Sequence, residues 1–187
     1  MADTSNLRAT TLLEGAPPLS HELRLMQIDD LPGVTGIFNA ASRARESTHG
    51  MRLWGVDEMR KFLFESPPIF ESFVAVSDGG VVGWTALTRH HLRDGYKHTA
   101  EMSLYVQPSF RRKGIGTALA ETILSRASAL NLHNILAIVF KDVPYVIASA
   151  EKRFGFSIAA CFPEAFDDNG KYHDILILEK LVALEVT

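Results

Sequence analysis

The chain has 187 residues, enough for one domain with a single hydrophobic core. Its formal net charge of −3 gives no indication of a nucleic acid or an anionic membrane surface as a partner. The single cysteine excludes an internal disulfide framework and suits a cytoplasmic protein, and the longest apolar runs are too short to span a bilayer.

Residues 1–20 are polar and lack the continuous apolar stretch of a signal peptide. Pro17 and Pro18 near the end of this stretch oppose regular structure. We therefore expect a flexible N-terminal tail over residues 1–20, followed by one domain over residues 21–187.

Apolar spacing and turn signals divide the remaining chain into alternating strands and helices. In chain order, the expected elements are a strand at 21–27, a helix from Asp29 or Asp30 to about Ala41, a helix at 56–65, strands at 73–76, 81–88 and 98–107, a helix from 115 to about 130, a strand at 134–140, a helix between Asp142 and Gly155, and strands at 158–162 and 173–181. Either Asp29 or Asp30 is a suitable helix cap. The continuous apolar run at 134–140 indicates a strand buried on both faces. The order βααβββαβαββ predicts an α/β (mixed α+β) fold, with a mixed sheet and helices on both faces.

The stretch from Glu101 to Asn131 reads as a strand, a cationic turn and an amphipathic helix. One face of the strand carries Met102, Leu104 and Val106, and the other carries Glu101, Ser103 and Tyr105. The turn contains Arg111, Arg112, Lys113, Gly114 and Gly116. A buried helical stripe follows at Ile115, Leu119, Ile123, Ala127 and Leu130. Aligned N–H groups, the helix dipole and basic side chains converge at the helix start, which favours a phosphate or pyrophosphate there.

The spacing Arg-x-x-Gly-x-Gly, from Arg111 to Gly116, is weak when taken without its context. The alternative is an ordinary strand–helix turn whose basic residues serve solubility. The dinucleotide fingerprint Gly-x-Gly-x-x-Gly would need a glycine at Leu119, and the Gly-Lys-Ser/Thr of a P-loop is missing. The position between a strand and an amphipathic helix favours the ligand-binding interpretation.

The run from Leu104 to Leu119 resembles the acetyl-coenzyme A signature of the GNAT superfamily of N-acetyltransferases, and within it the phosphinothricin acetyltransferase branch. Further matches are Val82-Gly83, Arg93 with Tyr96 before Thr99-Ala100-Glu101, Phe154-Gly155-Phe156, and Gly170 to Asp174. The resemblance implies a single domain with a central, mixed, mostly antiparallel sheet flanked by helices. It also implies acetyl-CoA as co-substrate and a small-molecule primary amine, such as an amino acid, phosphinothricin or methionine sulfone, as acceptor. Direct attack in a ternary complex is expected, and many relatives form homodimers.

The same resemblance implies residue roles. Glu101 is the candidate general base, and a solvated carboxylate at a strand end is the alternative. Main-chain groups of Leu104, Tyr105 and Val106 are expected to pair with the pantetheine arm. The pyrophosphate is expected at Arg112, Lys113, Gly114, Ile115, Gly116 and Thr117, with Arg111 shaping or flanking this loop. Arg93 and Tyr96 are expected beside the acceptor, the alternative being an exposed loop arginine. Arg43, Arg45 and His49 are weaker candidates on the acceptor side.

Two positions depart from the family pattern. The usual Asn at the start of the last helix is replaced by Val143 or Pro144, and the usual Tyr or His near its end by Ala150 or Glu151. The acid that protonates the leaving thiolate is therefore unassigned. This leaves two alternative functions: a module that binds acyl-CoA without efficient catalysis, and an acetyltransferase acting on a protein N-terminus or lysine.

Two further residue types receive simpler interpretations. Cys161 lies in an apolar strand and is expected in the core. The seven histidines show no ligand spacing, so we expect no metal site.

Overall fold

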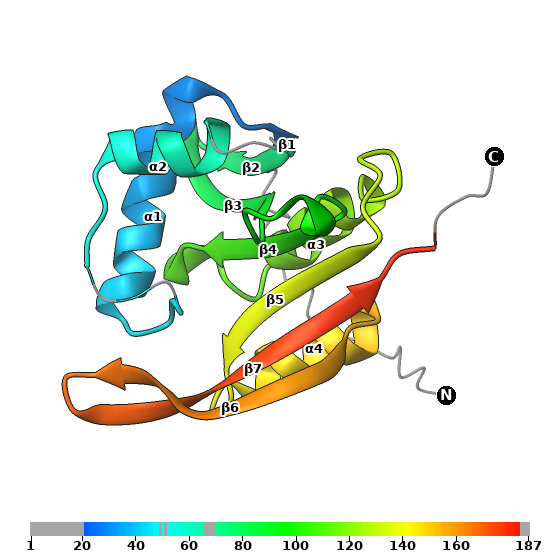
Figure 1. Cartoon of the computed structure of the whole chain (residues 1–187). Coiled ribbons are helices and arrows are strands. Elements are labelled where there is room, and N and C mark those ends of the chain that lie inside the picture. The colour runs from blue at the N-terminus through cyan, green and yellow to red at the C-terminus, as the bar shows by residue number, and fades with distance from the viewer. Residues whose placement is uncertain (1–20, 49, 51, 66–69, 184–187) are drawn as a thin grey trace, which may run out of the picture.

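The computed structural model describes residues 21–183 except 49, 51 and 66–69, so the tail expected over residues 1–20 and the candidate His49 lie outside the described residues. The elements are β1 (Glu22–Leu25), α1 (Leu31–Arg43), α2 (Val56–Phe64), β2 (Ser72–Ser77), β3 (Gly80–Arg89), β4 (Thr99–Val106), α3 (Ile115–Ser125), β5 (Asn134–Phe140), α4 (Pro144–Phe154), β6 (Ser157–Asp168) and β7 (Lys171–Leu181) (Figure 1). The predicted order of strands and helices is confirmed. No helix in these ranges has the length and apolar character needed to cross a bilayer.

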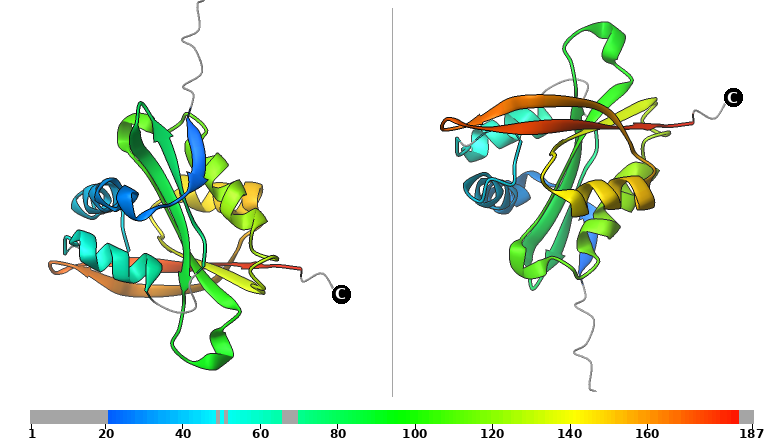
Figure 2. Two further views of the ribbon diagram at one scale, coloured as in Figure 1. Left: turned by 90° about the horizontal axis from the view of Figure 1, so that it is seen from above. Right: turned by 90° about the horizontal axis from the view of Figure 1, so that it is seen from below.

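The strands form one sheet of seven, in the order β1-β2-β3-β4-β5-β7-β6. Only β4 and β5 pair in parallel, and the other neighbours are antiparallel. Helices α1 and α2 lie on one side of the sheet, and α3 and α4 lie on the other (Figure 2). The predicted mixed, mostly antiparallel sheet with helices on both faces is therefore confirmed.

The two central strands pair over a short distance and then diverge. Strand β4 pairs with β5 only at Thr99↔Asn134, Ala100↔Ile135 and Glu101↔Leu136. Beyond that point β4 continues along β3 to Val106, while β5 continues along β7 to Phe140 (Figure 1). Within the described chain, the β4 main chain after Glu101 thus has no ladder partner on its β5 side.

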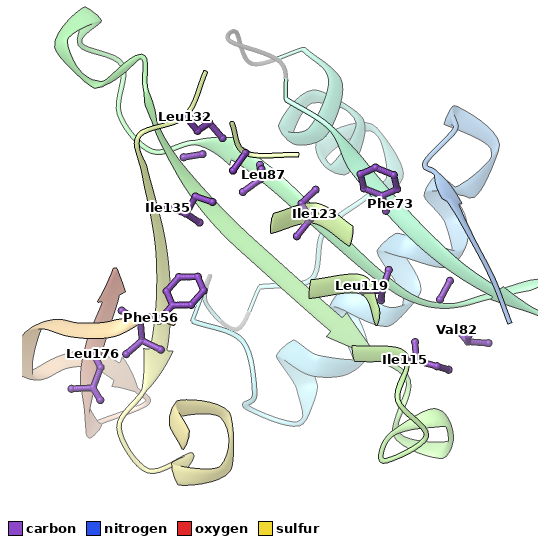
Figure 3. Close-up of a cluster of buried hydrophobic side chains, with 14 residues drawn as sticks. Phe73, Val82, Leu87, Ile115, Leu119, Ile123, Leu132, Ile135, Phe156 and Leu176 are labelled. Atoms are coloured by element: carbon purple, nitrogen blue, oxygen red, sulfur yellow. The ribbon is translucent and has the colours of Figure 1, made fainter. Parts of the chain in front are cut away.

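A hydrophobic cluster holds α3 against the sheet on one face (Figure 3). Leu119 and Ile123 of α3 are fully buried against β-strand residues that include Leu87 and Ile135. The helix comes close to β3 because residue 83 is glycine: a Cβ there would lie 3.2 Å from Leu119 Cδ1. A second cluster, centred on Trp84, packs α1 and α2 on the opposite face.

The helix α3 is shorter than expected. It ends at Ser125, and turns bring the chain to residue 131. The amides of Arg126 and Ala127 each donate to the carbonyl three residues earlier, which tightens the chain out of α-helical geometry. Ala127 is nevertheless buried, although it lies in the turns that follow α3 and not in the helix itself.

Asp30 does not cap α1. Its carboxylate oxygens accept hydrogen bonds from the Arg24 guanidinium, both at 2.7 Å, and from the Gln27 amide at 2.8 Å. Arg24 lowers the pKa of Asp30 below its ordinary value of 3.8 through these side-chain hydrogen bonds. The carboxylate thus fixes the connection from β1 to α1.

Two burial predictions on the other half of the sheet are wrong. Cys161 is exposed, not in the core, because β6 is an edge strand paired only with β7. Ile158 and Phe162 of the same strand are also about half exposed, at 49% and 50%. Strand β5 is not buried on both faces, since Ile135 and Phe140 are its only buried residues and the other five are partly exposed.

Candidate active site

The start of α3 presents main-chain amides in the way that the sequence suggested. Gly114 occupies the N-cap position in the left-handed region, with φ +85°, a conformation that glycine adopts without steric cost. Glycine has no side chain to cap the first turn, and Arg112 and Lys113 are exposed beside it. The positive end of the helix dipole and two cations therefore meet at this turn, an arrangement that binds anions.

Arg111 shapes this loop from its flank. Its Nε donates to Val106 O at 3.1 Å, and its two terminal nitrogens contact the Glu46 carboxylate at 2.9 and 2.5 Å. Hydrogen bonding to Glu46 raises the pKa of the Arg111 guanidinium above its ordinary value. The loop before α3 is thereby connected to the segment that follows α1.

The β4 main chain offers alternate residues to the side where β5 has diverged. The Gln107 amide donates to Val82 O on β3, and main-chain groups of successive strand residues alternate in direction. The N–H and C=O groups of Leu104 and Val106 therefore face the diverging β5. Those of Tyr105 face β3, so the expectation that the Tyr105 main chain would contact the pantetheine arm is corrected.

Four consecutive residues after α1, Arg45–Thr48, connect the diverging strands; we call them the bridging segment. Ser47 Oγ lies 2.9 Å from Tyr105 OH on β4, and Thr48 Oγ1 donates to Ile138 O on β5 at 3.2 Å. The other two residues make ion pairs: Arg45 with the buried Asp168 at 2.5 Å, and Glu46 with Arg111. The bridging segment thus joins the end of β6, both central strands and the loop before α3.

The Tyr105 side chain serves the site although its main chain does not. Its ring packs against Trp84 and Phe38, with centroid distances of 4.9 and 5.7 Å. Burial raises the pKa of Tyr105 to about 12, so the phenol is protonated at neutral pH. The hydroxyl is thus held neutral against Ser47 of the bridging segment.

Glu101 lies at the last residue pair before β4 and β5 diverge. Its side chain is 17% exposed, and its Oε2 lies 3.7 Å from Nδ1 of His90, which follows β3. Beside these groups is an open pocket of about 320 Å³ whose walls are Phe62, Thr88, Arg89, His90, His91 and Leu92. The Arg89 Nε donates to the His91 carbonyl at 2.6 Å, which fixes the loop that forms one wall.

Arg93 and Tyr96 lie outside the walls of this pocket. The Arg93 side chain is exposed, and its amide donates to His91 Nδ1 at 3.1 Å. The Tyr96 ring packs on the His91 ring, with centroids 4.9 Å apart. Tyr96 therefore supports a pocket residue, whereas the structure does not bring the Arg93 guanidinium to the pocket.

Of the remaining candidates, Thr117 contacts another helix, whereas Arg43 and Glu151 are exposed. Thr117 Oγ1 accepts a hydrogen bond from Arg153 at 3.2 Å, so the first turn of α3 is connected to α4. Arg43 is exposed, and Glu151 is exposed at the position where an acid for the thiolate was sought. No group of three His, Cys, Asp or Glu side chains is placed to hold a metal ion within the described ranges.

The sequence interpretation missed two residues, His90 and Ser47. His90 follows the predicted strand at 81–88 in a polar loop, and its contact with Glu101 depends on the register of the hairpin, which the sequence does not display. Ser47 lies in a stretch whose apolar residues show neither helical nor strand spacing, so the sequence around it did not indicate a contact with Tyr105.

Comparisons with known proteins place this geometry in a family. Residues 34–156 match the model of the Acetyltransferase (GNAT) family. The chain is 30% identical over 159 residues to YwnH of Bacillus subtilis, provisionally named a phosphinothricin acetyltransferase, covering 83% of this chain and 96% of the relative. It is 26% identical over 165 residues to an L-methionine sulfoximine/L-methionine sulfone acetyltransferase of Pseudomonas paraeruginosa, covering 86% and 94%.

A solved structure shares the fold. It is a GNAT superfamily phosphinothricin acetyltransferase from Sinorhizobium meliloti in complex with AcCoA, with a TM-score of 0.78 and 23% identity, covering 87% of this chain and 88% of the other. The family match spans more than half of the chain and includes the diverging strands, Glu101 and the start of α3. The chain therefore belongs to the GNAT family of acetyltransferases.

Proposed function

We propose that the protein transfers the acetyl group of acetyl-CoA to the primary amine of a small amino acid or amino acid analogue. One observation carries the proposal: Glu101 lies where β4 and β5 diverge, and its carboxylate is 3.7 Å from His90, which lines a pocket of about 320 Å³. The names of the relatives, which act on phosphinothricin or on methionine sulfoximine and sulfone, support this acceptor class.

The residues present fit the coenzyme. Leu104 offers its N–H and C=O toward the side that β5 vacates, and Val106 offers its N–H there, since its carbonyl accepts from Arg111; an extended pantetheine arm would add to β4 at these groups as a short strand does. The amides from Arg112 to Thr117 and the cations before α3 suit the pyrophosphate. When bound, acetyl-CoA supplies a thioester whose carbonyl carbon accepts the amine. The coenzyme complex of the Sinorhizobium structure, which shares this fold, supports the assignment.

The main chemical task left to the side chains of this protein is removal of a proton from the acceptor amine. An amine with a pKa of about 8–10 is mostly protonated at neutral pH and must lose a proton before it attacks. Glu101 is placed to accept that proton at the edge of the pocket. The pocket walls combine Phe62 and Leu92 with two histidines, which suits a small acceptor with an aliphatic stem and a polar end group.

The test is acetyl-CoA-dependent thiol release, measured with a thiol-reactive dye, in a panel of phosphinothricin, methionine sulfone, methionine sulfoximine and common amino acids. Acetylation of at least one of these α-amines, confirmed by mass spectrometry of the product, is expected. If the protein binds acetyl-CoA in a calorimeter but acetylates none of these amines, the small-molecule proposal is wrong. Transfer to peptide N-termini or lysines alone would also contradict it.

We also propose that the protein forms a homodimer through β6 and is cytoplasmic. The edge strand exposes apolar residues of the kind that pack between subunits, with Phe162 50% and Ile158 49% exposed. The exposed thiol of Cys161 on the same strand suits a reducing compartment. Light scattering of the purified protein is expected to give twice the chain mass, and Phe162→Glu is expected to give the monomer. A wild-type protein that is monomeric at micromolar concentration would contradict the dimer.

A further inference from the structure

A cation from α4 lies beside the amides that begin α3. Arg153 is in the last turn of α4, and its Nη1 donates to Thr117 Oγ1 at 3.2 Å. The Ala118 amide donates to Gly114 O, so the amides of residues 115–117 precede the first hydrogen bond of the helix. The Arg153 guanidinium is therefore held at the hydroxyl of the last residue whose amide points out of the helix start.

This guanidinium is accessible, and its ion pair is loose. The Arg153 Nε lies 3.9 Å from Glu121 Oε1, which is longer than a hydrogen bond of about 2.7–3.2 Å. The two side chains are 59% and 60% exposed, and ion pairs between such exposed groups stabilise a fold little. A ligand that carries more negative charge than a carboxylate can therefore replace Glu121 as the partner of Arg153.

Two neighbouring cations, in the loop before α3, are placed differently. Arg111 directs its terminal nitrogens to Glu46, which follows α1, and α1 lies on the opposite side of the sheet from α3 and α4 (Figure 2). Lys113 Nζ lies 5.1 Å from the centroid of the Phe110 ring. Arg153, by contrast, comes from α4 on the same side of the sheet as α3, and a hydrogen bond connects it to the first turn of that helix.

The coenzyme carries a second anionic group in addition to the pyrophosphate. The ribose of acetyl-CoA bears the pyrophosphate on its 5′ carbon and a phosphate monoester on its 3′ carbon. The second pKa of a phosphate monoester is about 6, so this group carries nearly two negative charges at neutral pH. The planar guanidinium of arginine presents parallel N–H donors that match phosphate oxygens. An accessible arginine beside the pyrophosphate site is thus suited to the 3′-phosphate.

We propose that Arg153 binds the 3′-phosphate of acetyl-CoA and thereby makes the protein prefer this coenzyme to its 3′-dephospho form. This inference rests on the proposed function, which assigns the pyrophosphate to the amides before and within the first turn of α3. Because one ribose joins the two groups, a pyrophosphate at those amides brings the 3′-phosphate beside the first turn. Arg153 keeps its hydrogen bond to Thr117 and exchanges its contact with Glu121 for the phosphate.

A purely structural role for Arg153 predicts a different result. If Arg153 only connected α4 to α3, its loss would weaken the binding of both forms of the coenzyme by the same factor. If Arg153 contacts the 3′-phosphate, its loss weakens the binding of the form that carries this phosphate and leaves the other form unaffected. The ratio of the two dissociation constants therefore separates the two roles.

The test measures by calorimetry the Kd of acetyl-CoA and of 3′-dephospho-acetyl-CoA for the wild type, Arg153→Gln and Lys152→Gln. Lys152 is the adjacent exposed residue, so Lys152→Gln removes the same charge from the same turn. The wild type and Lys152→Gln should bind acetyl-CoA about 3–10-fold more tightly than the dephospho form, as expected for a charge-assisted hydrogen bond weakened by exposure to solvent. In Arg153→Gln this ratio should fall to about 1, with the Kd of the dephospho form unchanged.

A further variant should change the ratio in the other direction. Glu121→Gln removes the carboxylate that competes for Arg153, so it should tighten the binding of acetyl-CoA more than that of the dephospho form. A ratio lower than that of the wild type would contradict the proposed exchange of partners.

The failure of this proposal is distinct from the failure of the proposed function. A wild type that binds both forms equally, or an Arg153→Gln protein that keeps the wild-type ratio, would overturn the role of Arg153 and leave the pyrophosphate site and acetyl transfer intact. An equal loss of affinity for both forms in Arg153→Gln would assign this residue a structural role. A wild type that binds neither form would contradict the proposed function, and this inference with it.

Discussion

A single methyl group on β3 tests how closely β3, β4 and α3 are packed beneath the proposed coenzyme site. Gly83 lies opposite Val106, and a Cβ there would lie 3.1 Å from Tyr105 O, 3.2 Å from Leu119 Cδ1 and 3.3 Å from Val106 Cγ2. Ordinary carbon contacts are about 3.5–4.0 Å, so these neighbours must move by a few tenths of an ångström. Overpacking of this kind costs about 1–3 kcal/mol, while the lower entropy of the unfolded chain returns about 0.4–1 kcal/mol. We therefore expect Gly83→Ala to lower the free energy of unfolding by about 1–2 kcal/mol.

The matched control is Gly36→Ala, the same chemical change at an exposed position of α1 where a Cβ meets nothing within 4 Å. Alanine is favoured over glycine in a helix interior by about 1 kcal/mol, so this variant should gain stability. In urea unfolding, the midpoint of Gly83→Ala should lie below that of the wild type, and the midpoint of Gly36→Ala should lie above it. The melting temperature of each variant should change by about 2–4 °C for each kcal/mol of change in the free energy of unfolding. Because Val106 must shift, Gly83→Ala should also raise the KM for acetyl-CoA. A Gly83→Ala protein as stable as the wild type would refute the close packing.

Three further outcomes are expected. Glu101→Gln should lower kcat by about 10²–10⁴-fold, while calorimetry should show that acetyl-CoA binding is retained. Loss of coenzyme binding would contradict the role of this carboxylate as a general base. Tyr105→Phe removes the hydrogen bond to Ser47 and should lower the free energy of unfolding, measured in urea, by about 0.5–1.5 kcal/mol, and an unchanged free energy of unfolding would contradict this contact. Arg24 lowers the pKa of Asp30, so the ion pair stabilises the fold fully well above pH 3.8, and this stabilisation is lost as the pH falls through the lower pKa of the folded state. In Asp30→Asn, the free energy of unfolding should therefore fall less steeply as the pH is lowered below about 4. An acid dependence equal to that of the wild type would argue against the ion pair.

The regular part of the fold could be predicted because each element has a local signal. The apolar run at 134–140 gave the bounds of β5, and the strands predicted at 73–76 and 81–88 are the two strands of the β2–β3 hairpin. The turn before α3 was identified because glycine and basic residues follow a strand. These features depend on neighbours in the chain, which a sequence displays directly.

The errors come from features that depend on the whole sheet. Cys161 lies in a continuous apolar run, Ile158–Phe162, of the kind that fills a core, but β7 is inserted between β5 and β6 and leaves β6 at the edge. The contact of His90 with Glu101 depends on the register of the β3–β4 hairpin across a polar loop. The Arg93 position likewise depends on how that loop folds back, and composition alone carries no such information.

The bridging segment has a consequence for how distant parts of the site respond to one another. Its four adjacent residues hold both diverging strands, the end of β6 and Arg111, so a change in the separation of β4 and β5 would also displace the loop before α3 and the end of β6. A ligand that alters this separation should therefore change the free energy of these contacts, and thermodynamic reciprocity requires the contacts to alter its affinity by the same factor. Substitution of a single residue of the segment should thus change coenzyme affinity as well as stability.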